Sequence, residues 1–378
     1  MIATVTKILK RIIINVFTQV RKQRFRKYCL SLADEIEVQL DHKKTPALDK
    51  HCRLWKQLVR NVDPKWYKIY STISGIEDYR YVPPDIHFAV LEPILNQRSM
   101  CRGYKDKNFY ERLNSNNLFP IAYLRNINGV FYDREYTPIS EKDIRNQINA
   151  LLDGVDKVIV KPALLSGGGR DLRVVDLTVE ELSIDNLKEQ YNKDYIVQEY
   201  IESTEYFRQF NPSSLNCIRI NTYRSVTTNE VYTDEILLLI GGKDSVVSNT
   251  HAGGLYIDVK TDGSLGKFAV NGKGLKHFAP VDVNKKFSEF GKVPQINEFQ
   301  KVASDVAYMY PYQRLLGFDL CLDKNGEVRV IEVNNMFTGI GGQMLCGSLF
   351  KEYTDEVIQY CKKQRLFYDP IGMNDGAF

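Results

Sequence analysis

The chain has 378 residues, 43% of them hydrophobic and 26% charged, which is ordinary for a soluble globular protein of two or three domains. Its formal net charge is only +4, which argues against nucleic acid as a partner. The seven cysteines are scattered and form no CxxC pair, so we expect free thiols in a reducing, cytoplasmic compartment and no disulfide framework. The five histidines are also scattered, and no Cys/His cluster indicates zinc.

The N-terminal segment carries most of the charge imbalance. Its first 30 residues contain eight lysines and arginines, and the first acidic residue is Asp34. Apolar residues from Ile2 to Val20 recur at helical spacing, which predicts a basic amphipathic helix. No apolar run there is long enough to span a bilayer, and no signal-peptide cleavage site follows. We expect this helix either to dock on its own domain or to lie peripherally on the inner face of an anionic membrane.

Four regions are predicted along the chain. Residues 1–60 form a basic helical extension and residues 61–105 a connecting region rich in proline and aromatic side chains. Residues 106–205 and 206–378 alternate short strands with helices, which predicts an α+β fold with largely antiparallel sheets. The expected strands include 119–124, 156–165 and 194–202, and the expected helices include 142–154, 181–191, 296–310 and 351–364.

A carboxylate hairpin near the C-terminus is the strongest single signal. Asn325-Gly326 predicts a two-residue type I′ turn, which would pair Asp319 directly with Glu332. Side chains alternate along a strand, so Asn334 shares their face. The opposite, core-facing set is Leu320, Leu322, Ile331 and Val333.

Three oxygen ligands on one face suit a hard cation such as Mg²⁺ beside substrate phosphates. The alternative is a purely structural hairpin. Two like charges directly opposite each other cost roughly 0.2–1 kcal/mol, so such a hairpin would tend to avoid this pair.

Two further signals lie upstream. Lys161 ends an apolar strand and is followed by Ser166, Gly167, Gly168 and Gly169. Successive backbone amides of such a loop can form an anion-binding nest, although a flexible turn is the alternative, and the pattern is not a Walker A motif. An apolar strand then leads into the stretch Gln198–Ile201.

These motifs, taken in order with Lys107, resemble the ATP-grasp superfamily over about residues 100–350. The resemblance implies two α+β domains that clasp ATP between antiparallel sheets. It also implies that 106–205 holds the N-terminal and lid part, and that 206–378 is the C-terminal domain with the magnesium site. The thirteen-residue step from Asp319 to Glu332 is similar to that of D-alanine–D-alanine-ligase-like members.

The resemblance also implies residue roles. Lys107 and Lys161 would contact phosphates, and Ser166, Gly167, Gly168 and Gly169 would form the lid. Adenine would contact Gln198, Glu199, Tyr200 and Ile201, and ribose would contact Glu205. Asp319, Glu332 and Asn334 would bind Mg²⁺, with Mn²⁺ as an alternative.

A closer resemblance is to the sugar-transfer-associated ATP-grasp family, which is linked to polysaccharide and capsule synthesis. It is carried by residues 213–225, 249–263, 277–280 and 315–319. One departure is Gly317, where peptide-ligase members often have an arginine. Arg219 is the candidate replacement that would steady the transferred phosphoryl group, with a surface strand arginine as the alternative. His251 is a candidate contact to substrate or γ-phosphate, with a turn histidine as the alternative.

The leading functional hypothesis is an ATP- and Mg²⁺-dependent ligase that joins a carboxylate to an amine through an acyl phosphate. Its substrates would be small or glycan-linked molecules of cell-envelope polysaccharide synthesis. A kinase for a sugar hydroxyl, with Asp323 or His251 as base, is the second hypothesis. A non-catalytic nucleotide-binding scaffold is the third.

Overall fold

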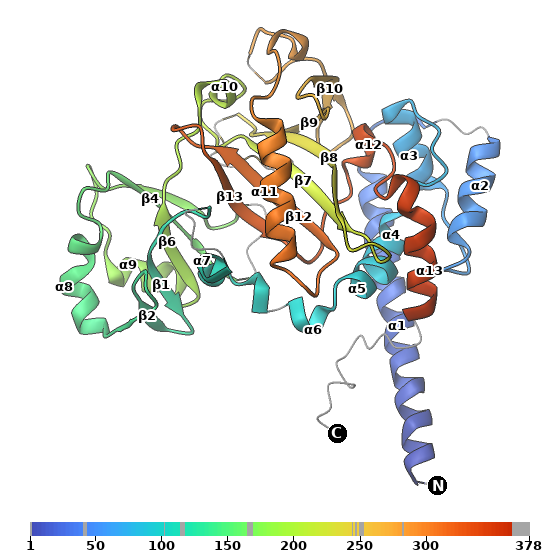
Figure 1. Cartoon of the computed structure of the whole chain (residues 1–378), viewed down its shortest axis with the longest axis horizontal. Helices are drawn as coiled ribbons and strands as arrows, with labels where there is room; N and C mark the ends of the chain where they lie inside the picture. Colours follow the sequence, from blue (N-terminus) through green and yellow to red (C-terminus); the bar gives the residue numbers. More distant parts are fainter. Residues whose placement is uncertain are drawn as a thin grey trace.

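The computed structural model describes residues 2–40, 44–101, 103–113, 118–164, 169–243, 245, 248, 253–281 and 283–364. Two antiparallel sheets and a group of helices around the N-terminus make up the molecule (Figure 1). This is the α+β class predicted from the sequence. All seven cysteines are free.

The smaller sheet has six strands in the order β3-β2-β1-β6-β4-β5, and every neighbouring pair is antiparallel. Helices α8 (Glu141–Leu151) and α9 (Ile184–Tyr191) pack against it through Ile144, Ile148 and Leu187. The strands are β1 (Ala122–Ile127), β2 (Val130–Tyr132), β3 (Pro138–Ile139), β4 (Lys157–Pro162), β5 (Arg173–Asp176) and β6 (Tyr195–Glu199).

The larger sheet has seven strands in the order β11-β10-β9-β8-β7-β12-β13. Helix α11 (Ile296–Tyr308) packs on it, and the alternating apolar residues of β7 and β12 face that helix. The strands are β7 (Cys217–Arg224), β8 (Val231–Ile240), β9 (Leu255–Val259), β10 (Leu265–Val270), β11 (Lys276–His277), β12 (Leu315–Leu322) and β13 (Val328–Asn334). Short helix α10 (Glu205–Arg208) connects the two sheets.

The N-terminal region is helical beyond residue 60 as well. Residues 61–105, predicted as a connecting region, contain several helices that join α1 (Ile2–Asp34) and α2 (Pro46–Trp55). Thr45 caps α2 by accepting the Leu48 N–H at 3.2 Å. The other helices are α3 (Lys65–Ser74), α4 (Pro84–Ile86), η1 (His87–Leu91), α5 (Glu92–Leu95), α6 (Arg98–Cys101), η2 (Gly103–Lys105), η3 (Lys107–Phe109) and α7 (Tyr110–Leu113).

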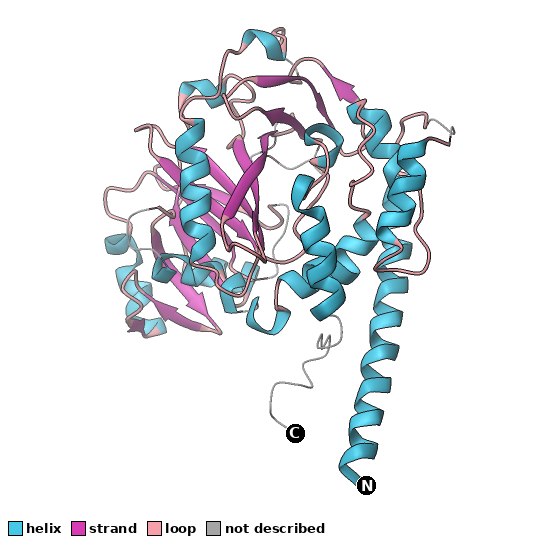
Figure 2. Ribbon diagram, turned by 45° about the vertical axis from the view of Figure 1, so that its right-hand side comes forward, coloured by secondary structure: helices cyan, strands magenta, loops and turns pink. Residues whose placement is uncertain are grey.

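These helices cover part of the larger sheet together with the C-terminal helices. Trp66 and Tyr70 of α3 share a core with Leu237 and Tyr256 of the sheet. The C-terminal elements are α12 (Gln343–Cys346), η6 (Lys351–Tyr353) and α13 (Thr354–Gln364), and η5 (Phe287–Glu289) lies before α11. The first half of α1 extends away from the rest of the molecule (Figures 1 and 2). Among the described residues, no helix is both long and apolar enough to cross a bilayer.

The turn of the carboxylate hairpin differs from the prediction. The Gly326 N–H donates to the Asp323 carbonyl at 2.9 Å, and Gly326 has φ +79° whereas Asn325 does not take a positive φ. A type I′ turn needs a positive φ at both central residues, so the predicted two-residue turn is wrong. The Asp323 carboxylate accepts the N–H groups of Asn325 and Glu327, both at 2.9 Å, and this favours a longer turn.

The predicted pairing of Asp319 with Glu332 is nevertheless observed. Near the turn the strands run one residue out of the predicted register, with Leu320 opposite Val330. An irregularity at Ile331 then restores the register. As a result Ile331 lines a cavity, contrary to its predicted place on the core face. The core-facing residues are Leu320, Leu322, Val330 and Val333.

Candidate functional site

A cavity of about 1000 Å³ is lined by residues of both sheets and of the N-terminal helices. Its lining has two parts of different chemistry. The polar part contains Lys107, Lys161, Arg170, Arg219, Asp319, Glu332 and Asn334. The aromatic part contains Phe25, Tyr28, Trp66, Tyr70, Phe88 and Phe337.

A row of charged side chains crosses three neighbouring strands of the larger sheet. Asp319 on β12 lies opposite Arg219 on β7 and opposite Glu332 on β13. Arg219 binds Asp319 in a bidentate manner, with Nη2 2.8 Å from Oδ2. Asn334 Nδ2 lies 3.5 Å from the same Oδ2. The antiparallel register thus places the predicted metal ligands and Arg219 on one cavity wall.

Two buried lysines, one on η3 and one on β4 of the smaller sheet, face this row in the cavity. Lys107 Nζ lies 2.9 Å from Glu332 Oε1, and both Lys107 and Lys161 are 8% exposed. Burial, reinforced by the like charge of Lys107, lowers the pKa of Lys161 to about 8. Burial alone would raise the pKa of Glu332, but Lys107, Lys161 and Arg219 outweigh it and hold that pKa below its ordinary value.

These residues fit a cation bound together with phosphates. The four positive side chains of the polar part outnumber its two carboxylates, which leaves a charge of +2 and favours an anionic ligand. Over the residues that the structure describes, no group of three or more His, Cys, Asp or Glu side chains could hold a metal ion. A cation would therefore use Asp319, Glu332, the Asn334 amide oxygen and ligand oxygens, which is the donor set that Mg²⁺ takes in nucleotide sites.

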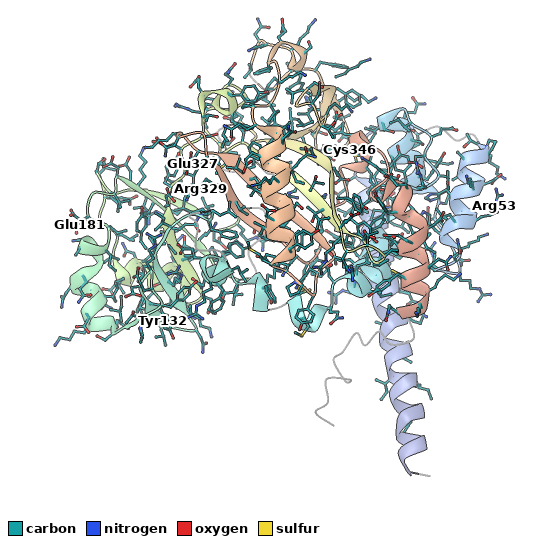
Figure 3. All side chains as sticks on the ribbon, viewed as in Figure 1. Arg53, Tyr132, Glu181, Glu327, Arg329 and Cys346 are labelled. Atoms are coloured by element: carbon teal, nitrogen blue, oxygen red, sulfur yellow. The ribbon has the colours of Figure 1, made fainter. Side chains whose placement is uncertain are left out.

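The stretch Gln198–Ile201 also lines the cavity, at the end of β6. Glu199 is fixed there by Arg329, whose Nη2 lies 2.7 Å from Glu199 Oε2. Arg329 belongs to β13, and Figure 3 shows it on the side of the hairpin toward the smaller sheet. This ion pair links the two sheets, between the stretch Gln198–Ile201 and the hairpin that carries the carboxylate row.

The remaining predicted residues lie elsewhere or outside the described part of the chain. Ser166, Gly167, Gly168 and His251 lie outside the described residues, whereas Gly169 lines the cavity with φ +70°. Glu205 is exposed at the start of α10 and is not among the residues that line the cavity. Its ribose role stays a prediction, as do the ligand roles of the other residues.

A buried carboxylate beneath the cavity wall was missed from the sequence. Glu235 on β8 is 5% exposed, and it accepts a hydrogen bond from Asn221 of β7. Burial raises the pKa of Glu235 to about 7. Its Oε2 has no hydrogen-bond partner among the described residues. The sequence carried one signal for it, since Glu235 is the polar residue at the start of the otherwise apolar segment EILLLI.

Glu235 and Asn221 support the glycine-rich loop that follows the carboxylate hairpin. The Asn221 amide donates to the Gly339 carbonyl at 3.2 Å. A Cβ added to Gly342 would lie 2.6 Å from Glu235 Oε1, so glycine is required there by close packing. The loop lines the cavity at Gly339, Gly341 and Gly342, and Glu235 therefore helps to shape its wall.

The aromatic part of the cavity was not predicted from the sequence either. Phe25, Phe88 and Phe337 have ring centroids 6.0 to 6.3 Å apart, although they lie in α1, in η1 and after β13. Residues so far apart in the chain give no local pattern. Only the packing of α1 against the body brings them together.

A family model described as sugar-transfer associated ATP-grasp matches residues 89–358 of this chain. No curated protein sequence matches it. Among solved structures, the ATP-grasp ligase PsnB, complexed with minimal precursor, Mg and ADP, is 14% identical with a TM-score of 0.35, covering 71% of this chain and 62% of its own.

Two further solved structures are similar over comparable shares of this chain. The D-alanine-D-alanine ligase from Coxiella burnetii is 14% identical with a TM-score of 0.38, covering 70% of this chain and 59% of its own. The biotin carboxylase from Campylobacter jejuni is 12% identical with a TM-score of 0.38, covering 68% and 46%. This chain thus spans less than two thirds of the length of each of these proteins.

The pKa of Lys161 leads to a testable pH dependence. Below about pH 8 the side chain is protonated and can contact a phosphate, and above that pH its charge is lost. We expect the dissociation constant for ATP, measured by calorimetry, to rise by up to about tenfold per pH unit above pH 8. Lys161→Arg should keep its charge and remove this rise. The same rise in Lys161→Arg would contradict the assignment.

The buried Glu235 leads to a prediction about stability. Its folded pKa of about 7 lies above the ordinary 4.5, so its contribution makes the protein less stable as pH rises between these values. Glu235→Gln should remove this loss, worth up to about 3 kcal/mol, so the gain over wild type should be seen at pH 8 and not at pH 4. Urea denaturation of both proteins at pH 4 and pH 8 measures the free energy of unfolding. The exposed Glu181→Gln is the control, and a gain that is equal at both pH values would contradict the prediction.

Proposed function

Because this chain belongs to the sugar-transfer associated ATP-grasp family, we propose that it is an ATP- and Mg²⁺-dependent ligase that joins a carboxylate to an amine. The observation that carries the proposal is the charged row of Arg219, Asp319 and Glu332, which faces two buried lysines in one cavity. This arrangement supplies positive charge for a triphosphate and oxygen ligands for a cation. Phosphoryl transfer between bound substrates needs no covalent nucleophile from the protein.

The proposed reaction has two steps. A carboxylate oxygen attacks the γ-phosphorus of ATP, and the bond from that phosphorus to the bridging oxygen breaks to release ADP. The amine nitrogen then attacks the acyl carbon, the carbon–oxygen bond to phosphate breaks, and the nitrogen loses a proton to give an amide and phosphate. Bound Mg²⁺ would neutralise charge on the phosphate oxygens.

The side chains of the polar part have distinct proposed roles. Lys107 and Lys161 hold phosphate oxygens, since both are buried cations beside the carboxylate row. Arg219 is held in place by its bidentate contact with Asp319, and it would steady the phosphoryl group in place of the arginine missing at Gly317. Water exclusion matters because an acyl phosphate hydrolyses readily, and the loop before Gly169 is the proposed lid.

The kinase alternative is less well supported. A kinase requires a base near its hydroxyl acceptor, for which the sequence offers Asp323 or His251. His251 lies outside the described residues. Asp323 instead accepts two turn N–H groups and lies 3.3 Å from Arg329, outside the cavity lining. The carboxylate and amine acceptors are proposed to belong to cell-envelope or capsular polysaccharide synthesis, in line with the sugar-transfer description of the family.

The acyl phosphate can be tested with labelled substrates. Candidate carboxylates, such as amino acids and uronic acids, would carry ¹⁸O and be incubated with ATP, Mg²⁺ and hydroxylamine. Ligation predicts ADP, a hydroxamate and phosphate containing one ¹⁸O atom, as measured by mass spectrometry. ADP with a phosphorylated product and no free phosphate would support the kinase. Tight ATP binding without turnover on any acceptor would support a scaffold.

The carboxylate row can be tested by Glu332→Gln. Loss of this charge should lower Mg²⁺-dependent ATP turnover by about 100-fold or more, because the cation loses one of its two carboxylates. Glu327→Gln, on the exposed turn of the same hairpin, should retain wild-type turnover. An unchanged circular dichroism spectrum and melting curve would show that the variant folds. Near-wild-type turnover in a folded Glu332→Gln protein would rule out the metal assignment.

A further inference from the structure

The projecting half of α1 carries an exposed apolar stripe. Leu9, Ile12, Val16 and Val20 are 52 to 58% exposed, and Ile13 is 39% exposed. Their spacing of three or four residues places them along one side of the helix. This half of α1 extends away from the body in both views of the molecule (Figures 1 and 2). The stripe is therefore a continuous apolar surface on a single helix.

The stripe is not a continuation of the face by which α1 packs on the body. In the second half of α1 the buried residues are Cys29 and Ala33. Val20 and Cys29 are nine residues apart, which is about 2.5 helical turns, so they lie on opposite sides of the helix. Bending α1 back onto its own body would thus leave the stripe pointing outward. Within the part of the chain that the structure describes, nothing covers the stripe.

The charge of the segment identifies the partner. The first 30 residues contain eight lysines and arginines and no acid, and Arg24 and Lys27 are exposed on α1. Pairing with a second copy of this helix would bring eight positive charges against eight, which opposes association. An apolar stripe in a strongly basic helix matches a bilayer with anionic lipid headgroups.

We propose that α1 lies in the plane of an anionic bilayer, with Leu9, Ile12, Ile13, Val16 and Val20 inserted among the lipids. Helices of this kind bury their apolar face below the headgroups while their basic residues attract anionic lipid. The described residues contain no helix that could span the bilayer, so the attachment is peripheral.

The same helix links the membrane to the cavity. Phe25, Tyr28 and Leu32 of α1 line the aromatic part, next to Phe88 and Phe337. Val20 and Phe25 are five residues apart, so the stripe ends about 7.5 Å along the axis from this lining and roughly 140° around the helix from it.

Vesicle binding tests the docking directly. The full-length protein would be sedimented, without nucleotide, with vesicles of phosphatidylcholine alone or with about 30% phosphatidylglycerol. We expect at least about tenfold tighter binding to the anionic vesicles, and weaker binding at high salt. The triple variant Ile13→Ser/Val16→Ser/Val20→Ser should bind them at least about tenfold more weakly.

The matched control is Val130→Ser/Val179→Ser, which removes exposed valines of β2 and of the turn after β5 and should bind as wild type does. Absence of wild-type binding, equal binding to both vesicle types, or full binding by the triple variant would overturn the docking. So would a triple variant of half the wild-type mass in solution, because the stripe would then join two copies. ATP binding, measured separately in solution, shows that the variants fold, so failure of the docking leaves the ligase proposal standing.

Discussion

Two carboxylates held directly opposite each other on neighbouring strands impose the central constraint on this structure. Asp319 and Glu332 repel each other across the β12–β13 ladder, and neither is fully exposed to water. Each is matched by its own cation, Arg219 from the adjacent strand and Lys107 from the segment before the smaller sheet. The second contact crosses between the parts of the molecule, so the charge balance of the row depends on how they are assembled.

The rest of the assembly keeps that row in place. Arg329 ties β13 to Glu199 at the end of β6, which fixes the smaller sheet against the larger one. Beneath the row, Asn221 joins Glu235 to the glycine-rich loop at Gly339. A buried carboxylate that is partly unsatisfied costs stability, and such costs are common where a wall must be shaped for a ligand.

The cavity joins two chemistries that come from distant parts of the chain. Its polar part is built from the strands and suits a triphosphate with a cation, whereas its aromatic part needs α1 and the segments around Phe88 and Phe337. The N-terminal helix is therefore part of the site as well as a projecting element. A single helix thus lines the cavity with its second half and carries the proposed membrane-binding stripe on its first half.

The sequence by itself determined the α+β class and the main helices and strands of both sheets. These follow from local periodicity and alternation, which act over a few residues. The turn at Asp323 and the irregularity at Ile331 could not be predicted, because each depends on side-chain hydrogen bonds or on packing beyond the hairpin. Likewise, only the tertiary structure decided that Arg219 holds Asp319, that Glu235 lies buried under the glycine loop, and that Phe25 meets Phe337. Such contacts join residues that are far apart in the chain, and their geometry is set by how the sheets and helices pack.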